Sequence, residues 1–293
     1  MTEKPRRRHE SVGAALSRAT EVLSRAGVES PAVDAAALVE AVTGLSRTEQ
    51  LIRRDTELGA RQAEELARLL ARRAAREPLQ HVLGEATFLD LRLETRPGVL
   101  IPRPETERLV ELVLSEIAAA SEPKGSTVID VGTGTGAIAL ALKQARPELE
   151  VWATDVSQAA LDLAGANAER LGLVVEVRRS DLLADPGVRA AAARAVAVVS
   201  NPPYLPDADR GTVQPEVVVE PEGALYAGPD GLSVARRLVR QAAGAMRPGA
   251  LLALELDPRN VGELARELRT AGFAAVRVEP DLTGRERFVI ARR

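Results

Sequence analysis

The chain has 293 residues, enough for one large domain and a small one, and its 45% hydrophobic and 28% charged residues are typical of a globular protein. It contains no cysteine and two histidines, which excludes disulfides, thiolate zinc sites and cysteine nucleophiles and predicts no metal site. The net charge of −3 argues against a partner held mainly through phosphates, so no stable nucleic-acid binding is expected.

Residues 1–78 are predicted to form a small helical domain. The basic cluster Lys4–Arg8 is interpreted as a solvated terminus. From Ser11 to Glu77, apolar residues recur three and four positions apart, and glycine and proline divide the pattern into four or five short helices. No stretch approaches the ~20 apolar residues of a membrane span. A cytoplasmic, monomeric enzyme without membrane contact is therefore expected.

Residues 79–104 are predicted to form a β-hairpin linker. Thr87–Thr95 alternates in the manner of a strand, Arg96-Pro97-Gly98 indicates a turn, and Val99–Ile101 is the expected second strand. A helix is predicted next, from Glu105 to Ala120.

Residues 105–293 form the expected α/β part, because strand and helix patterns alternate from Ser126 onward. Such alternation predicts a mostly parallel sheet covered on both faces. The last two strands are joined by a short turn at residues 282–284, so they must be antiparallel to each other. The expected strands are Thr127–Val131, Glu150–Asp155, Val174–Arg178, Ala195–Ser200, Leu251–Leu256, Ala275–Glu279 and Glu286–Ala291.

A glycine-rich turn after the first of these strands predicts a cofactor site. The turn comprises Gly132, Thr133, Gly134, Thr135 and Gly136. It precedes a helix, whose N-terminal N–H groups can face a ligand, and Asp155 at the end of the next strand can accept both ribose hydroxyls. These features fit either NAD or S-adenosyl-L-methionine. Asp130 favours the second, since a carboxylate suits an ammonium and sulfonium better than a pyrophosphate.

An acceptor site is predicted where the fourth strand ends. Its motif is Asn201, Pro202, Pro203 and Tyr204. Open α/β sheets bind ligands at the carboxyl ends of their strands, and consecutive prolines stiffen the loop. The Asn201 side-chain oxygen and the Pro202 carbonyl can both accept hydrogen bonds from one NH₂ group, and Tyr204 can stack on a flat amide or base.

With both motifs placed, the sequence resembles the PrmC/HemK family of protein-(glutamine-N5) methyltransferases from about residue 31 to the C-terminus. The less common stretches that carry the resemblance are PLQHVLG at 78–84, VLIPRPETE at 99–107, EPEGAL at 220–225 and PDGL at 229–232. The resemblance implies a class I, Rossmann-like methyltransferase domain behind a helical partner-binding domain. It also implies S-adenosyl-L-methionine as cofactor, S-adenosyl-L-homocysteine as product, and the Gly-Gly-Gln glutamine of class 1 peptide chain release factors as acceptor.

By this resemblance the glycine turn holds the methionine portion of the cofactor and Asp155 its ribose, while Asn201 and Pro202 orient the glutamine amide beside Tyr204. Arg103, Pro104, Glu105 and Thr106 are expected in the wall of the substrate site. Many relatives carry an adenine-covering aromatic residue after Asp181, where this chain has Leu182. Asp181 and an aliphatic contact from Leu182 are expected at the cofactor instead.

The sequence is also compatible with other functions. Related enzymes methylate a glutamine of a ribosomal protein, and adenine or guanine amino groups also offer a flat NH₂ to this motif. The acidic charge balance weighs against a nucleic-acid substrate. An NAD oxidoreductase would give the Asn-Pro-Pro-Tyr motif no task, and a cofactor-binding module without catalysis would not need Asn201 and Tyr204.

Overall fold

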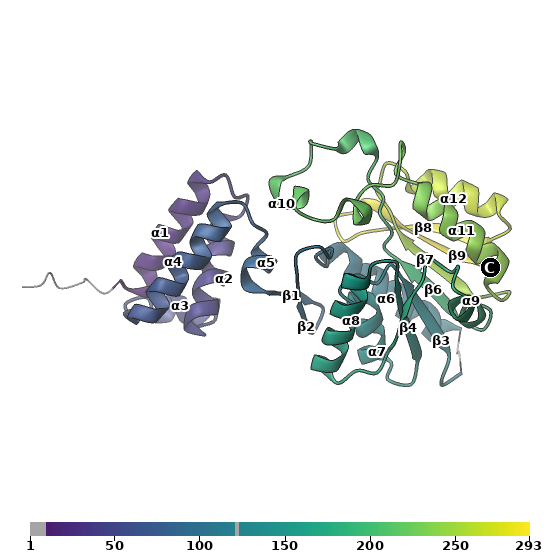
Figure 1. Ribbon diagram of the computed structural model, residues 1–293, viewed down its shortest axis with the longest axis horizontal. Helices are drawn as coiled ribbons and strands as arrows, with labels where there is room; N and C mark the ends of the chain where they lie inside the picture. Colours follow the sequence, from purple (N-terminus) through teal and green to yellow (C-terminus); the bar gives the residue numbers. More distant parts are fainter. Residues whose placement is uncertain (1–9, 121–122) are drawn as a thin grey trace, which may run out of the picture. The chain divides into compact units, whose positions relative to one another are not determined.

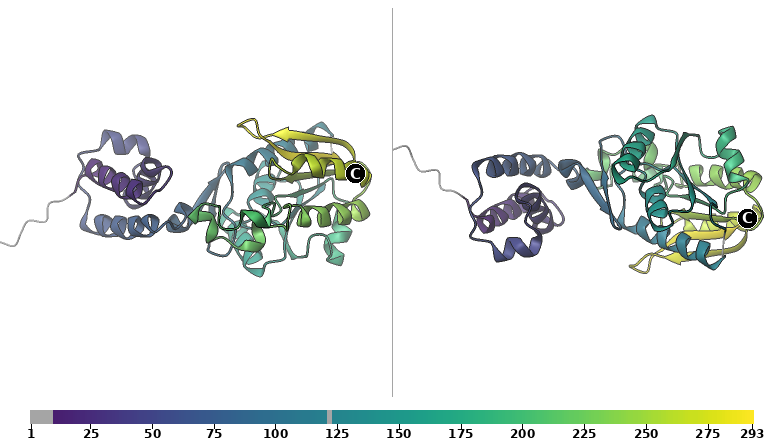
Figure 2. Two further views of the ribbon diagram at one scale, coloured as in Figure 1. Left: turned by 90° about the horizontal axis from the view of Figure 1, so that it is seen from above. Right: turned by 90° about the horizontal axis from the view of Figure 1, so that it is seen from below.

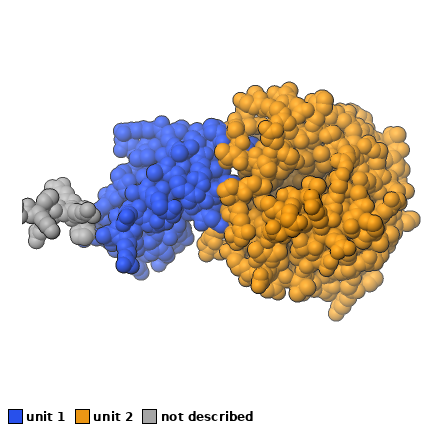
Figure 3. Space-filling model, viewed as in Figure 1, with its two compact units in different colours: residues 1–84, 215–217 blue, residues 85–214, 218–293 orange. Residues whose placement is uncertain are grey.

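The computed structural model describes residues 10–120 and 123–293, and the basic cluster Lys4–Arg8 lies outside these described residues. The chain divides into two compact units, residues 1–84 with 215–217 and residues 85–214 with 218–293 (Figure 3). The two units divide after Gly84, whereas the sequence pattern predicted a boundary after residue 78. The difference is the short helix α5 (Leu79–Leu83), whose Val82 joins the core of the first unit.

The first unit is helical, as expected, and its helices pack against one another (Figure 2). They are α1 (Val12–Arg25), α2 (Pro31–Thr43), α3 (Arg47–Ile52), α4 (Ala60–Ala74) and α5. Ser11 caps α1 by accepting a hydrogen bond from the Ala14 N–H, and Ser46 and Glu49 form a capping box on α3. Valine, alanine and leucine side chains at helical spacing on α1, α2 and α4 are buried between the helices and form the core.

The second unit contains a seven-stranded sheet of order β5-β4-β3-β6-β7-β9-β8 (Figure 1). Its strands are β3 (Thr127–Val131), β4 (Glu150–Asp155), β5 (Glu176–Arg179), β6 (Ala197–Ser200), β7 (Leu251–Glu255), β8 (Ala274–Pro280) and β9 (Glu286–Arg292). The first five run parallel, and β9 is antiparallel to both of its neighbours. The predicted α/β fold and the antiparallel last pair are confirmed.

Helices cover both faces of this sheet (Figure 1). On one face lie α6 (Pro104–Ala119), α7 (Ala137–Ala145) and α8 (Gln158–Leu171); on the other lie α9 (Pro186–Ala192), α11 (Ser233–Ala245) and α12 (Val261–Thr270). Successive strand residues point to opposite faces, so Val128 joins one core layer and Ile129 the other. Between β6 and α11 runs a long segment with the short helix α10 (Pro215–Val218). None of the helices in the described ranges is long and apolar enough to cross a membrane.

The hairpin differs from its prediction. Its strands are β1 (Glu85–Phe88) and β2 (Leu91–Glu94), which pair antiparallel around a two-residue turn. The prediction of one strand across Thr87–Thr95 was wrong because the chain reverses inside that range. Val99–Ile101 forms no strand either. Val99 is instead buried against α8, where its apolar side chain packs without a sheet partner.

Candidate active site

The carboxyl ends of β3, β4 and β6 open into a cavity of about 530 Å³. The two predicted motifs meet there because β3 and β6 are neighbours, with Val131 beside Ser200 in the register. The predicted site residues that line this cavity are Arg103, Gly132, Thr133, Gly134, Thr135, Asp155, Asp181, Leu182, Asn201, Pro202 and Pro203. Asp130, Gly136, Tyr204 and Glu105 are not among the lining residues.

The glycine turn holds its shape by left-handed backbone and hydrogen bonds to β4. Gly132 has φ +74° and Gly134 φ +56°, conformations that glycine adopts without steric cost. The N–H groups of Gly132 and Thr133 both donate to the Thr154 carbonyl, at 2.8 and 2.9 Å. The turn is thereby fixed beside the end of β4, with its backbone in the cavity wall.

Gly136 has a different task from the one predicted by motif. It is the N-cap residue of α7 with φ +87°, and a Cβ there would lie 3.0 Å from the Leu140 side chain and 3.3 Å from that of Ala164. Its lack of a side chain therefore allows α7 to pack closely on α8, behind the cavity rather than in its wall.

Asp155 presents a carboxylate to the cavity from the end of β4. Its two oxygens accept hydrogen bonds from the Gly134 N–H at 3.0 Å and the Ser157 N–H at 2.9 Å. Burial raises the pKa of Asp155, and these backbone N–H groups oppose the shift. Each oxygen keeps a lone pair for one further donor, so the carboxylate can receive a pair of neighbouring hydroxyls.

Asp130 lies beneath the glycine turn and is fully buried. Its Oδ2 accepts hydrogen bonds from the Thr133 hydroxyl at 2.6 Å and the Ala139 N–H at 3.1 Å, while Oδ1 has no partner among the described residues. Burial raises the pKa of Asp130 to about 7. The side chain thus braces the turn, and a cation bound above it would favour its ionised form.

Asn201 and the two prolines line the cavity, whereas Tyr204 turns into the protein. The Tyr204 phenol lies 3.5 Å from Oε1 of Glu255, and burial raises its pKa. The Asn201 Nδ2 donates to the hydroxyl of Thr106 at 3.0 Å. Its carbonyl oxygen Oδ1 accepts no hydrogen bond from the part of the chain that the structure describes. An acceptor oxygen is therefore available at the cavity.

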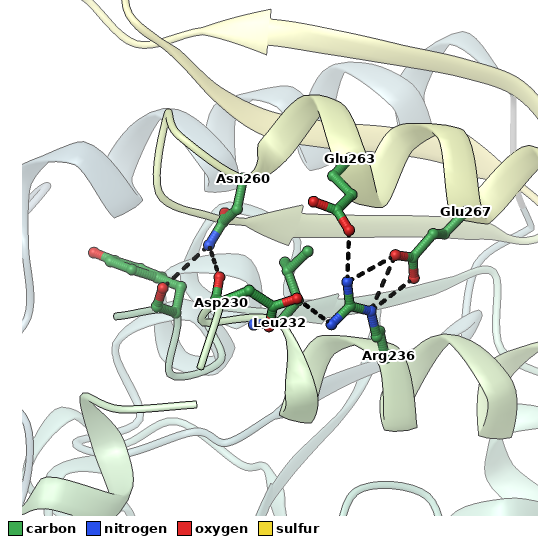
Figure 4. Close-up of polar contacts among 7 residues, drawn as sticks. Asp230, Leu232, Arg236, Asn260, Glu263 and Glu267 are labelled. Atoms are coloured by element: carbon green, nitrogen blue, oxygen red, sulfur yellow. Dashed lines mark hydrogen bonds and ion pairs between the residues drawn. The ribbon is translucent and has the colours of Figure 1, made fainter. Parts of the chain in front are cut away.

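Hydrogen bonds from Asn260 hold the backbone of the Asn-Pro-Pro-Tyr motif (Figure 4). The Asn260 side chain, 5% exposed, donates to the carbonyls of Tyr204 and Asp230, both at 3.2 Å. Asp230 is held in turn by Arg236, which also pairs with two glutamates of α12. The loop after β6 is thereby tied to the start of α12 at one point.

Two further ion pairs lie at the rim of the cavity. Arg103 pairs with Oε2 of Glu220 at 2.6 Å, and Glu220 is 4% exposed. Arg103 therefore joins the start of α6 to the segment that follows α10. Asp181 is paired with Arg237 of α11, and the neighbouring Leu182 adopts φ +58°, which is uncommon for leucine.

The motif-based prediction missed Glu255, Asn260 and Asn167, and it placed Thr106 at most in a wall. The fully buried Asn167 bonds the backbone of Glu94 in β2 and the carbonyl of Thr135, so it joins the hairpin to the glycine turn. One signal was available for Glu255, because it is a single carboxylate at the end of an otherwise apolar strand.

Two families of known domains match the chain: the PrmC N-terminal domain over residues 14–84 and the Methyltransferase small domain over residues 91–243. A Deinococcus radiodurans protein named "Release factor glutamine methyltransferase" is 53% identical over 95% of this chain and 97% of its own. One of the same name from Gloeobacter violaceus is 42% identical over 86% of this chain and 87% of its own.

Among solved structures, the hMettl16 catalytic domain in complex with MAT2A 3'UTR hairpin 6 is similar, with a TM-score of 0.56. It is 20% identical, and the match covers 76% of this chain and 81% of that one, which shows a shared fold alone. The family follows from the motifs of the cavity, from both domain matches and from relatives that are 42–53% identical over most of the chain. The chain belongs to the release factor glutamine methyltransferase family.

Proposed function

We propose that this protein transfers a methyl group from S-adenosyl-L-methionine to the side-chain amide nitrogen (N5) of the Gly-Gly-Gln glutamine in a class 1 peptide chain release factor. The observation that carries the proposal is the meeting of the glycine turn, Asp155 and Asn201 in one cavity. The shared name of relatives matched over nearly the whole chain supports the acceptor protein. A translation factor as substrate supports a reaction in the cytoplasm.

The residues of the cavity fit S-adenosyl-L-methionine. Asp155 can receive the two ribose hydroxyls, and Leu182 offers an aliphatic contact for the adenine. The methionine portion would lie along the glycine turn, whose left-handed residues leave no side chain in its way. The unpartnered Oδ1 of buried Asp130 fits a positively charged neighbour better than a pyrophosphate, which would repel it.

The residues at the acceptor end of the cavity would orient the substrate amide. An amide nitrogen is a poor nucleophile because its lone pair is delocalised into the carbonyl. The Asn201 side-chain oxygen and the Pro202 carbonyl would each accept one N–H of the substrate amide and fix its nitrogen in the cavity. Alignment of this kind supplies about 7–11 kcal/mol in well-ordered systems. When bound, S-adenosyl-L-methionine supplies a methyl group activated by positively charged sulfur. The methylated amide gives up one proton to solvent.

Asn201→Ala tests this assignment. It should leave cofactor affinity, measured by calorimetry, nearly unchanged and lower turnover by roughly 100-fold, as the loss of one oriented contact in a transition state does. Turnover is followed by transfer of labelled methyl to a purified release factor, and peptide mass spectrometry locates the product. Parental turnover in this variant would contradict the proposed role of Asn201.

The same assay separates the acceptor classes. Label on a ribosomal protein, or on nucleic-acid bases, with none on the release factor would refute the proposed acceptor. Label on the release factor at a residue other than the Gly-Gly-Gln glutamine would refute the proposed position.

A further inference from the structure

A buried chain of hydrogen bonds runs from Glu255 to the amide of Asn201. Glu255 ends β7 and is 1% exposed, and its Oε2 accepts a 2.7 Å hydrogen bond from the Thr106 hydroxyl. Thr106, 4% exposed in the first turn of α6, accepts in turn a 3.0 Å hydrogen bond from Asn201 Nδ2. Three elements far apart in the sequence therefore meet in this chain of bonds, which we call the Glu255 relay.

The proton of the Thr106 hydroxyl decides which way the Asn201 amide faces. An ionised carboxylate only accepts hydrogen bonds, and a hydroxyl has one proton to donate. Thr106 therefore donates to Glu255 and offers only lone pairs to its other neighbour. Asn201 must then present its NH₂ group to Thr106, which leaves its carbonyl oxygen for the cavity.

We propose that Glu255 and Thr106 are positioning residues that fix the Asn201 amide with its oxygen toward the cavity, where it accepts a hydrogen bond from the substrate NH₂ group. The inference rests on the proposed function, since it requires an NH₂ group as methyl acceptor. The two amide orientations have nearly the same shape, so packing alone does not select between them. A reversed Asn201 amide would turn its own NH₂ group toward the NH₂ group of the substrate, and two N–H donors cannot form a hydrogen bond with each other.

The charge of Glu255 determines which group donates in each hydrogen bond of the relay. Burial raises the pKa of Glu255 to about 7; the Thr106 hydrogen bond, Arg287 on β9 and the Tyr204 hydroxyl oppose this shift, while Glu105 on α6 adds to it. A protonated Glu255 can donate to Thr106, whose own proton is then free to turn toward Asn201. The productive orientation is thus held above this pKa and lost as the pH falls through it.

Substitutions of Thr106 test the relay directly. Thr106→Val keeps the branched shape and removes the hydroxyl, so it should lower kcat by roughly 10- to 100-fold. Its affinity for S-adenosyl-L-homocysteine, measured by calorimetry, should stay at the parental value. Thr106→Ser restores the hydroxyl and should recover most of the lost turnover. Failure of serine to recover it, with a parental melting temperature, would overturn the relay.

Thr127→Val is the matched control. The Thr127 hydroxyl also donates to a glutamate, Oε2 of Glu150 at 2.6 Å, but at the amino end of β3 and outside the cavity. Loss of this bond can lower the melting temperature and should leave kcat unchanged. A fall in kcat equal to that of Thr106→Val would show that any lost threonine–glutamate bond has the effect, and would overturn the proposal.

The dependence of the rate on pH distinguishes the relay from a purely structural role of Glu255, which would not change that dependence. At saturating S-adenosyl-L-methionine, whose positive charge keeps Asp130 ionised, parental kcat should fall as the pH is lowered from about 8 to about 6, around the raised pKa of Glu255. Glu255→Gln cannot ionise, so its profile should lack this fall, and its rate at pH 8 should be lower because its amide can both donate and accept. A Glu255→Gln profile that keeps the parental fall would overturn the relay.

The proposed function and the Glu255 relay can be refuted independently. A parental enzyme that methylates no glutamine amide would refute the proposed function itself. A parental enzyme that does so, combined with parental kcat in Thr106→Val, would refute the relay alone.

Discussion

Replacing Gly231 with alanine probes how tightly the acceptor motif is held. Gly231 has φ +75°, and an added Cβ would lie 2.1 Å from the Tyr204 carbonyl oxygen and 2.9 Å from Asn260 Nδ2. No Cβ can occupy that space, so the Tyr204 backbone must move and its hydrogen bond from Asn260 must lengthen or break. The displaced segment is the one that carries Asn201 and Pro202.

The loss of folding stability in Gly231→Ala has two parts. A left-handed alanine costs about 1–2 kcal/mol, and forcing extra volume into a packed site costs about 1–3 kcal/mol. Gly249→Ala separates them, because Gly249 has φ +81° but an added Cβ meets no heavy atom within 4 Å. We expect Gly231→Ala to lower the free energy of unfolding by about 2–5 kcal/mol and Gly249→Ala by only the first part.

Thermal unfolding and methyl transfer measure the two consequences. For a unit of this size, each 1 kcal/mol corresponds to about 2–4 °C in melting temperature. Gly231→Ala should also lower kcat by at least about tenfold, because a displacement of about 1 Å at an orienting group can cost 100-fold. Gly249→Ala should keep parental kcat. Equal losses of stability in both variants, with parental kcat in each, would refute the close approach as the cause.

Two further predictions address the cofactor and the protein partner. Asp155→Ala should weaken binding of S-adenosyl-L-methionine by at least about tenfold, which is 1.4 kcal/mol, and unchanged affinity in calorimetry would remove Asp155 from the site. Leu51 and Ile52, which are 71% and 76% exposed on α3, are candidates for contact with a partner. Replacing both with aspartate should raise KM for a whole release factor but not for a short Gly-Gly-Gln peptide. An equal rise for both substrates would argue against docking by the helical unit.

Patterns within short stretches of the sequence predicted most elements of the fold correctly. The predicted and observed bounds of β3 and β4 agree, because the length of an apolar run is a local property. That Asn201 and Asp155 line one cavity could be predicted from the sequence, because parallel strands bring their carboxyl ends to one edge of the sheet.

What the local pattern left open was decided by contacts between distant segments. Val99–Ile101 has the composition of a strand, but it finds an apolar surface on α8 rather than a strand to pair with. Gly136 has the motif of a ligand glycine, and the approach of α8 makes it a packing glycine.

The same holds for the polar network behind Asn201. Thr106 and Glu255 are 149 residues apart, and their hydrogen bond exists only because α6 packs beside the end of β7. A hydrogen bond depends on the positions of two atoms within a few tenths of an ångström, and no periodicity in the chain encodes that distance. The sequence by itself determined which chemical groups reach this edge of the sheet, and the tertiary structure decided which of them touch.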